Sequence, residues 1–180
     1  MNIKIEQPTY SISENTKIIQ NSIDEVFNNG GGLVEISNGI YEISTIFLRK
    51  NVSLRINNNT VLIGSKNIND YSGPSLKSRY ANGVGNTQFK KYLSLIVVEN
   101  ADNSSIFGEG IIDGRGVYGE FFPNKNDPDK NRPFLIYVYN SNNFKLREIT
   151  LKDSSFYAFY AVESNDIDID NVNIRKLMNF

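Results

Sequence analysis

The chain has 180 residues, of which 39% are hydrophobic and 22% are charged, and its formal net charge is −1. This length and composition are typical of one globular domain with a substantial core, and the charge near zero disfavours nucleic acid or an anionic membrane as a partner. Because the sequence contains no Cys and no His, it excludes disulfides, thiol nucleophiles and imidazole catalysis. Only oxygen ligands remain for a metal, and we predict neither a metal site nor a cofactor.

Residues 1–8 alternate polar and apolar side chains and contain no apolar signal segment. No stretch of the sequence approaches the roughly 18 apolar residues of a membrane-spanning helix. We therefore expect a chain that has no membrane partner; as written it is cytoplasmic, but the sequence alone leaves its localisation unknown.

One segment, residues 14–29, predicts a helix. Asn15 and Thr16 can cap its start, and Gly30 to Gly32 can end it. Apolar residues recur between these limits with the period of 3.6 that is typical of a helix. The expected buried face consists of Ile18, Ile19, Ile23, Val26 and Phe27.

Short β-type segments, separated by Asn, Gly, Asp and Ser, follow the helix. We expect strands at residues 33–36, 40–43, 46–48, 52–56, 61–63 and 93–98, and from residue 106 onward. Two polar insertions, at 72–91 and 117–132, interrupt them. Such loops either wall a binding cleft or are solvated without a role.

A repeated apolar pattern indicates how the strands are arranged. The spacing that starts at Phe144 recurs from Ile167, which is 23 residues later. A fixed period of this size is typical of stacked coils, each of which buries its apolar face against its neighbours. We therefore predict an all-β fold, a right-handed single-stranded parallel β-helix, rather than a sandwich. The helix at 14–29 would cap its N-terminal end.

Residues 108–116 contain four glycines in nine residues. A glycine-rich loop can bind phosphate through backbone N–H groups, but the spacing here lacks a third glycine and no amphipathic helix follows. We interpret the stretch as a strand passage between coils, in which glycine serves the backbone geometry.

Carboxylates are the candidate catalytic groups, because glycosidic hydrolysis needs two of them. Asp166, Asp168 and Asp170 alternate with isoleucines, so a strand would place all three on one face, about 7 Å apart at successive positions. The alternative, which we favour, is a solvated outer face. Asp113 and Asp153 have no obvious partner, and we interpret them as formers of Asx turns.

Aromatic residues cluster at Phe156, Tyr157, Phe159 and Tyr160. They could stack on sugar rings, although alternation in a strand would turn at least half of them into the core. The same question applies to Tyr118, Phe121 and Phe122 in the second insertion.

Several blocks resemble, in order, the family 28 glycoside hydrolases, the polygalacturonases. Residues 16–24, 30–34 and 39–41 resemble the family's capping helix, three glycines and first coils. Residues 108–116 carry the most specific block, and Arg132-Pro133 and residues 151–154 follow in the family's order. The resemblance covers nearly the whole chain, from about Asn15. It implies a pectin lyase-like β-helix and inverting hydrolysis of α-1,4-galacturonosidic bonds in pectin.

The family's Asn-x-Asp, Asp-Asp, Gly-His-Gly and Arg-x-Lys motifs cannot be placed on this chain. We therefore expect residues 1–180 to form one β-helix domain, incomplete at its C-terminal end, that resembles the N-terminal part of such an enzyme. No catalytic residue carries over, and the chain alone is predicted to be inactive. Tyr157 and Tyr160 occupy positions near the family's cleft and are the candidate substrate contacts.

The implied partner is pectic polysaccharide or an oligogalacturonide. An alternative is a non-catalytic carbohydrate-binding or structural β-helix module. Because a β-helix that stops at residue 180 would expose its last coil, we also expect self-association through that coil.

Overall fold

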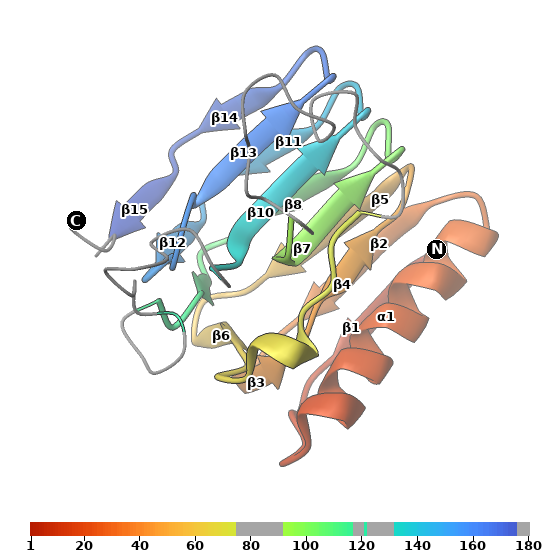
Figure 1. The fold of residues 1–180 in the computed structure, drawn as a ribbon. Coiled ribbons are helices and arrows are strands. Elements are labelled where there is room, and N and C mark those ends of the chain that lie inside the picture. The colour runs from red at the N-terminus through yellow and green to blue at the C-terminus, as the bar shows by residue number, and fades with distance from the viewer. Residues whose placement is uncertain (75–91, 117–120, 122–131, 176–180) are drawn as a thin grey trace.

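Three parallel sheets enclose the core, and each successive coil of the chain adds one strand to each sheet (Figure 1). The computed structural model describes residues 1–74, 92–116, 121 and 132–175. The prediction of a right-handed parallel β-helix is confirmed, since every strand pair between coils is parallel. Most of the two insertions predicted at 72–91 and 117–132 lies outside the described residues.

The strands fall into three ordered sets. The first sheet contains β1 (Asn2–Ile5), β2 (Gly32–Ile36), β5 (Val52–Ile56), β8 (Ser105–Phe107), β11 (Lys145–Arg147) and β14 (Asp168–Asp170). The second sheet contains β3 (Gly39–Ile43), β6 (Thr60–Gly64), β9 (Ile111–Asp113), β12 (Thr150–Lys152) and β15 (Asn173–Arg175). The third sheet contains β4 (Ile46–Leu48), β7 (Ser94–Glu99), β10 (Phe134–Tyr139) and β13 (Phe159–Val162).

Two helices complete the described structure, α1 (Ile12–Asn28) and the short 3-10 helix η1 (Ile68–Asp70). The strands predicted between residues 33 and 98 agree with β2 to β7 within two residues at each end. The sequence patterns did not predict β1, which pairs with β2 and extends the first sheet at its N-terminal edge. Within the described residues, no helix combines the length and apolar character needed to cross a membrane.

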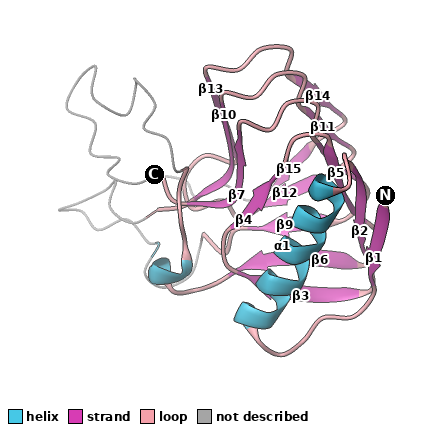
Figure 2. Cartoon of the chain, turned by 90° about the vertical axis from the view of Figure 1, so that its right-hand side faces the viewer, coloured by secondary structure: helices cyan, strands magenta, loops and turns pink. Residues whose placement is uncertain are grey.

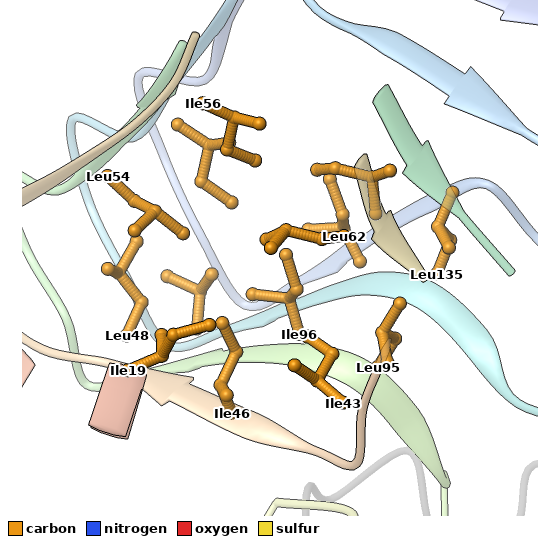
Figure 3. Packing of buried hydrophobic residues seen from close by; sticks show 14 of the residues in the cluster. Ile19, Ile43, Ile46, Leu48, Leu54, Ile56, Leu62, Leu95, Ile96 and Leu135 are labelled. Atoms are coloured by element: carbon orange, nitrogen blue, oxygen red, sulfur yellow. The ribbon is translucent and has the colours of Figure 1, made fainter. Parts of the chain in front are cut away.

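Apolar side chains stack in register along the interior. In the first sheet, Leu54, Ile106 and Leu146 are Cα partners in successive coils, and all three are fully buried. Figure 3 shows the side chains of the three sheets converging on this interior. Parallel strands in register place equivalent residues of successive coils above one another. The apolar pattern that repeats after 23 residues in the sequence therefore corresponds to these stacked side chains.

Helix α1 begins earlier than predicted. Its N-cap is Ser11, whose side chain accepts a hydrogen bond from Glu14 N at 3.3 Å, so the expectation of a cap at Asn15 and Thr16 is wrong. Ile18 and Phe27, predicted to be buried, are 40% and 42% exposed. The helix turns Asn15, Ile19, Ser22, Ile23 and Val26 towards the coils instead.

The polar side chains on that face close the edge of the first coil. Gln20 acts as a surrogate strand, because its Nε2 donates to Phe47 O at 3.1 Å and its Oε1 accepts from Phe47 N at 2.8 Å. Thr16 accepts from Ser44 N at 2.9 Å, and Asn15 donates to Glu42 O at 3.1 Å. Figure 2 shows α1 lying across this end of the stack. An unpaired strand edge is thereby satisfied without another strand.

Stacked asparagines form one corner of the β-helix, between the third and first sheets. Asn51, Asn103 and Asn143 have φ of 59°, 57° and 55°, a left-handed conformation that Asn tolerates well. Asn103 donates to Asn51 Oδ1 at 3.2 Å, and Asn143 donates to Asn103 Oδ1 at 2.9 Å. The repeated asparagines therefore both allow the turn and tie successive coils together.

The glycine-rich stretch 108–116 contains β9, which confirms its interpretation as a strand passage between coils. Gly108 has a φ of 117°, and a Cβ on Gly110 would lie 2.8 Å from Asn57 O. The glycines are therefore required by backbone conformation and by close contact with the preceding coil.

Asn15→Ala tests the edge closure by α1. Asn15 is 2% exposed, accepts from Thr9 N at 2.7 Å and donates to Glu42 O. Removing its amide leaves buried backbone groups without partners, so we expect the free energy of unfolding to fall by about 2–3 kcal/mol. Urea denaturation measures this change. Asn21→Ala, at an exposed position of the same helix, is the matched control, and an equal loss in both variants would contradict the closure role.

Candidate functional site

Aromatic side chains gather on the outer face of the third sheet. Along this face Phe47, Val97, Tyr137 and Tyr160 are successive Cα partners from β4 to β13. Their neighbours in sequence, such as Ile96 and Ile136, point into the main core. Because successive residues of a strand point to opposite faces, the register of the coils aligns these side chains in a row.

We call the cluster around this row the aromatic face. It consists of Tyr92, Phe134, Tyr137, Phe156, Tyr157 and Tyr160, and it is separate from the main core. Phe134 lies at its centre, with its ring centroid 5.8 Å from that of Tyr157 and 5.3 Å from that of Tyr160. Tyr137 and Tyr160 are stacked at 5.8 Å with an interplanar angle of 23°. The rings support one another and form a pre-organised surface.

Tyr157 is the most exposed member of this face, at 49%, whereas Phe134 and Tyr137 are buried beneath their neighbours. The ring of Tyr157 is nearly parallel to that of Phe134, at 14°. One side of Tyr157 therefore packs on the protein, and the half-exposed ring offers an apolar surface to a ligand. The C–H face of a sugar ring fits such a surface.

The expectation that at least half of the four aromatic residues singled out from the sequence face the core is wrong, because strand β13 begins only at Phe159 and only that residue packs against the main core. Phe159 points inward and stacks on Phe144 at 6.1 Å. Phe156, Tyr157 and Tyr160 lie in the aromatic face. The sequence patterns did not single out Tyr92, Phe134 or Tyr137, because they lie far from this cluster along the chain. A signal was available in Tyr137, since it stands 23 residues before Tyr160.

Of the three aromatic residues predicted in the second insertion, Phe121 is fully buried and packs edge-on against Tyr71 at 5.7 Å. It therefore belongs to the core. Tyr118 and Phe122 lie outside the described residues.

Arg132 borders the aromatic face. Its guanidinium carbon lies 4.5 Å from the centroid of the Phe156 ring, and the residue is 8% exposed. A guanidinium over an aromatic ring makes a favourable cation–π contact. Arg132 thereby fixes the orientation of Phe156, which in turn packs edge-on against Tyr157 at 4.4 Å.

Two phenol groups of the aromatic face, those of Tyr92 and Tyr137, have raised pKa values and are held in their protonated form. Burial raises the pKa of Tyr137 strongly, and the neighbouring Tyr92 and Tyr160 phenols raise it further. Burial also raises the pKa of Tyr92, with Tyr160 as the second cause. Neutral phenols can both donate and accept hydrogen bonds, as recognition of sugar hydroxyls requires.

The acidic residues are arranged differently from the sequence expectation. Only Asp168 and Asp170 lie in strand β14, while Asp166 precedes it with a φ of 54°, so the three carboxylates do not share one strand face. Asp168 forms an ion pair with Arg147 on the neighbouring coil. This contact gives Asp168 a structural role on the outside of the coil.

Asp113 and Asp153, for which the sequence indicated no partner, share one. Lys152 Nζ lies 2.6 Å from Asp113 Oδ2 and 3.4 Å from Asp153 Oδ2. The hydrogen bond to Asp113 is the main cause that raises the pKa of Lys152. Asp113 also accepts from Arg115 N at 2.9 Å, which confirms the predicted Asx turn at this position. These contacts stabilise the corner between the second sheet and the third sheet.

Two open depressions, of about 430 and 510 Å³, flank helix α1. Their lining residues do not include any member of the aromatic face, and both hollows are open to solvent. Among the residues that the structure describes, no group of three acidic side chains could hold a metal ion. The aromatic face is therefore the candidate functional site.

The comparisons with known proteins agree with the fold. The sequence profile described as Glycosyl hydrolases family 28 matches residues 49–178. A comparison with curated proteins gives no match.

Three solved structures are similar over almost the whole chain. A protein of Parabacteroides merdae ATCC 43184 named as a glycosyl hydrolase is 22% identical, with a TM-score of 0.77, over 97% of this chain and 75% of its own. The family 28 exopolygalacturonase of Yersinia enterocolitica is 19% identical, with a TM-score of 0.78, over 98% of this chain and 38% of the exopolygalacturonase chain. The polygalacturonase of Erwinia carotovora ssp. carotovora is 24% identical, with a TM-score of 0.64, over 98% and 51%. The chain thus spans about half or less of either polygalacturonase.

Tyr137→Phe tests the electrostatics of the aromatic face. Because the folded-state pKa of Tyr137 is raised, its contribution to stability is present below pH 10 and is lost as the pH rises above that value. At pH 11 the free energy of unfolding of the variant should therefore have fallen by roughly 1 kcal/mol less than that of the original chain. Denaturation curves between pH 8 and 11 measure the difference, with pH values chosen around the ordinary tyrosine pKa of about 10. Tyr10→Phe, at a fully exposed position, should follow the original chain, and identical curves for all three proteins would contradict the prediction.

Proposed function

The chain belongs to glycosyl hydrolases family 28, and on this premise we propose that it forms the N-terminal part of a pectin-degrading glycosidase. In this proposal the complete enzyme hydrolyses α-1,4-galacturonosidic bonds. Residues 1–180 supply the capped first coils and one part of the substrate surface, and the catalytic carboxylates belong to coils that follow them.

The observation that carries the proposal is the family match over residues 49–178 together with the aromatic face on the third sheet. The site residues proposed to contact substrate are Tyr157 and Tyr160. Similar structures also support a carbohydrate ligand, since the iota-carrageenase is complexed to iota-carrageenan fragments and a bacteriophage HK620 tailspike is in complex with a pentasaccharide. A pectic polysaccharide or oligogalacturonide is the partner that fits the family.

The acidic residues support the absence of catalysis in this chain. An inverting glycosidase holds its two carboxyl groups about 6.5–9.5 Å apart across the substrate, with a water between them. Asp168 is instead bound to Arg147, and Asp113 to Lys152. The direct test of the complete enzyme is the reading frame downstream of codon 180, where Asn-x-Asp, Asp-Asp, Gly-His-Gly and Arg-x-Lys should follow in order. Their absence from every frame and neighbouring gene would contradict the proposal.

The purified chain should release no reducing ends from polygalacturonate. The physical reason is that hydrolysis needs a general acid and a base that activates water. The family's motifs that carry these groups cannot be placed on this chain. A reducing-sugar assay, with an active polygalacturonase as the positive control, measures this. Turnover at ordinary enzyme rates, retained after repeated purification, would show that the catalytic residues lie within these 180 residues.

A second candidate function is a non-catalytic carbohydrate-binding module, which the exposed ring of Tyr157 favours. On this alternative the β-helix is a scaffold that presents the aromatic face. It differs from the first proposal in requiring that the chain bind oligogalacturonides by itself.

Tyr157→Ala distinguishes the two. If the chain is a binding module, calorimetric titration with oligogalacturonides should give measurable affinity, and the variant should bind about tenfold more weakly because a stacking contact worth on the order of 1–2 kcal/mol is lost. Tyr10→Ala, which removes a fully exposed ring at the N-terminal end, outside the aromatic face, should leave the affinity unchanged. A chain that shows no affinity would contradict the binding-module function and leave the first proposal standing.

A further inference from the structure

A hollow lies where the C-terminal half of α1 meets the third sheet. It has a volume of about 510 Å³ and is lined by Asp24, Phe27 and Asn28 of α1, by residues 49–50 and by residues 99–100. Figure 1 shows β4 between α1 and β7, at the N-terminal end of the stack. We call this site the helix-end hollow. In the proposed enzyme the further coils extend the other end of the stack, so they do not stack on this hollow.

Phe27 offers an apolar ring to the helix-end hollow. Successive residues of a helix are turned by about 100°, so Val26 is fully buried in the core whereas Phe27 is 42% exposed. A single exposed aromatic residue does not by itself mark a site. Its ring can nevertheless stack on the C–H face of a sugar if polar groups around it bind the hydroxyls.

Arg49 is held in a defined orientation in this hollow. Its Nε donates to Asp24 Oδ1 at 2.7 Å. Gln20 Nε2 donates to the same Asp24 oxygen at 3.1 Å and to Phe47 O at 3.1 Å. The ion pair uses Nε, and among the described residues the two Nη groups of Arg49 have no hydrogen-bond partner. A guanidinium that is fixed in this way presents a rigid fork of donors to neighbouring hydroxyl groups.

Asn100 supplies a further donor from the other side of the hollow. Its Oδ1 accepts a hydrogen bond from Asn140 Nδ2, which fixes the carboxamide at the corner of the coil. Within the described part of the chain its own Nδ2 has no acceptor, so this group can donate to a ligand. Asn28 adds an exposed carboxamide from the last turn of α1. Carboxamides both donate and accept hydrogen bonds, as sugar hydroxyls require.

The charges of the lining favour an uncharged ligand. Two carboxylates, Asp24 and Glu99, and two cations, Arg49 and Lys50, line the hollow, so its formal charge is zero. Lys50 Nζ also lies 3.5 Å from Asp102 Oδ2, which adds a carboxylate at the border. The hollow therefore has no excess of positive charge with which to attract a carboxylate, and a neutral sugar ring fits it better.

The helix-end hollow lies on the same side of the third sheet as the aromatic face. Glu99 is the Cα partner of Tyr139, and Tyr139 packs in the cluster of Phe134 and Tyr137. Strand β4 is three strand spacings from β13, about 14 Å. One extended oligosaccharide can therefore reach both the hollow and the aromatic face.

We propose that the helix-end hollow is a second carbohydrate subsite and that it binds an uncharged sugar residue, which in a galacturonan is a methyl-esterified galacturonate. The ring of Phe27 stacks on the sugar, and Arg49 and Asn100 donate to its hydroxyls. The inference rests on the proposed function for the choice of a carbohydrate ligand. It deepens that function by naming an esterified polymer as the ligand of this end of the stack.

Nuclear magnetic resonance of the 180-residue chain tests the subsite directly. The chain is titrated with a fully methyl-esterified oligogalacturonide long enough to span about 14 Å. The signals of the Arg49 Nε–H and of the Asn100 side-chain amide should both shift and saturate with one Kd. The de-esterified oligomer of the same length should have a Kd about tenfold higher at these signals, because its carboxylates meet a lining without excess positive charge.

Two substitutions test the contacts. Phe27→Ala should raise the Kd for the esterified oligomer about tenfold because the stacking surface is lost, and Arg49→Gln should have a similar effect because the guanidinium donors are lost. Ile18→Ala is the matched control, since Ile18 is a 40% exposed side chain of the same helix and does not line the hollow. Its Kd should equal that of the original chain. Circular dichroism and thermal unfolding establish that the variants are folded.

Four outcomes would overturn the inference. The first is binding that depends on Tyr157 but leaves the Arg49 and Asn100 signals unmoved, which would leave the proposed function standing. The second is an equal or lower Kd for the de-esterified oligomer at these signals, and the third is an unchanged Kd in Phe27→Ala. The fourth is no binding of either oligomer, after which the reading frame downstream of codon 180 would still decide the proposed function.

Discussion

The direction of the backbone hydrogen bonds governs this structure. In a parallel β-helix these bonds run along the stack, so each coil satisfies its polar groups and buries its apolar side chains only against the next coil. The first coil therefore needs a substitute for a neighbour. Helix α1 and strand β1 provide it, and Gln20 reproduces with one side-chain amide the two hydrogen bonds that a strand would make to Phe47. The two ends of the described stack differ for this reason.

The corners transmit the register from coil to coil. Asn51, Asn103 and Asn143 adopt a left-handed conformation and bond to one another, while Gly110 lets the backbone approach the coil below. Because these contacts hold the coils at one register, outward side chains from distant parts of the sequence stand in rows. The aromatic face is the row in which those side chains are rings, and Arg132 steadies its border.

The aromatic face and the acidic residues have separate roles in this chain. The rings form a firm, partly exposed apolar surface of the kind that a sugar can cover. The carboxylates examined as catalytic candidates are instead bound to cations, Asp113 to Lys152 and Asp168 to Arg147, where they stabilise corners and neighbouring coils. In the proposed function the aromatic face is part of the substrate surface, and the acid and base of hydrolysis are supplied by other coils.

The sequence by itself determined the fold class, most strand positions and the capping helix. The reason is that the stacked coils of a β-helix require a repeated apolar pattern, such as the one shared by Leu146 and Ile169, which is visible in the sequence. Only the tertiary structure decided which side of the helix is buried. Asn15 faces the coils because it hydrogen-bonds to a strand edge, and the apolar periodicity of the helix does not predict a buried polar residue. It also decided that Lys152 binds Asp113 of the preceding coil, and that Tyr137 completes the surface around Tyr157. These contacts join residues from different coils, and their partners follow from the register between coils rather than from neighbouring residues along the chain.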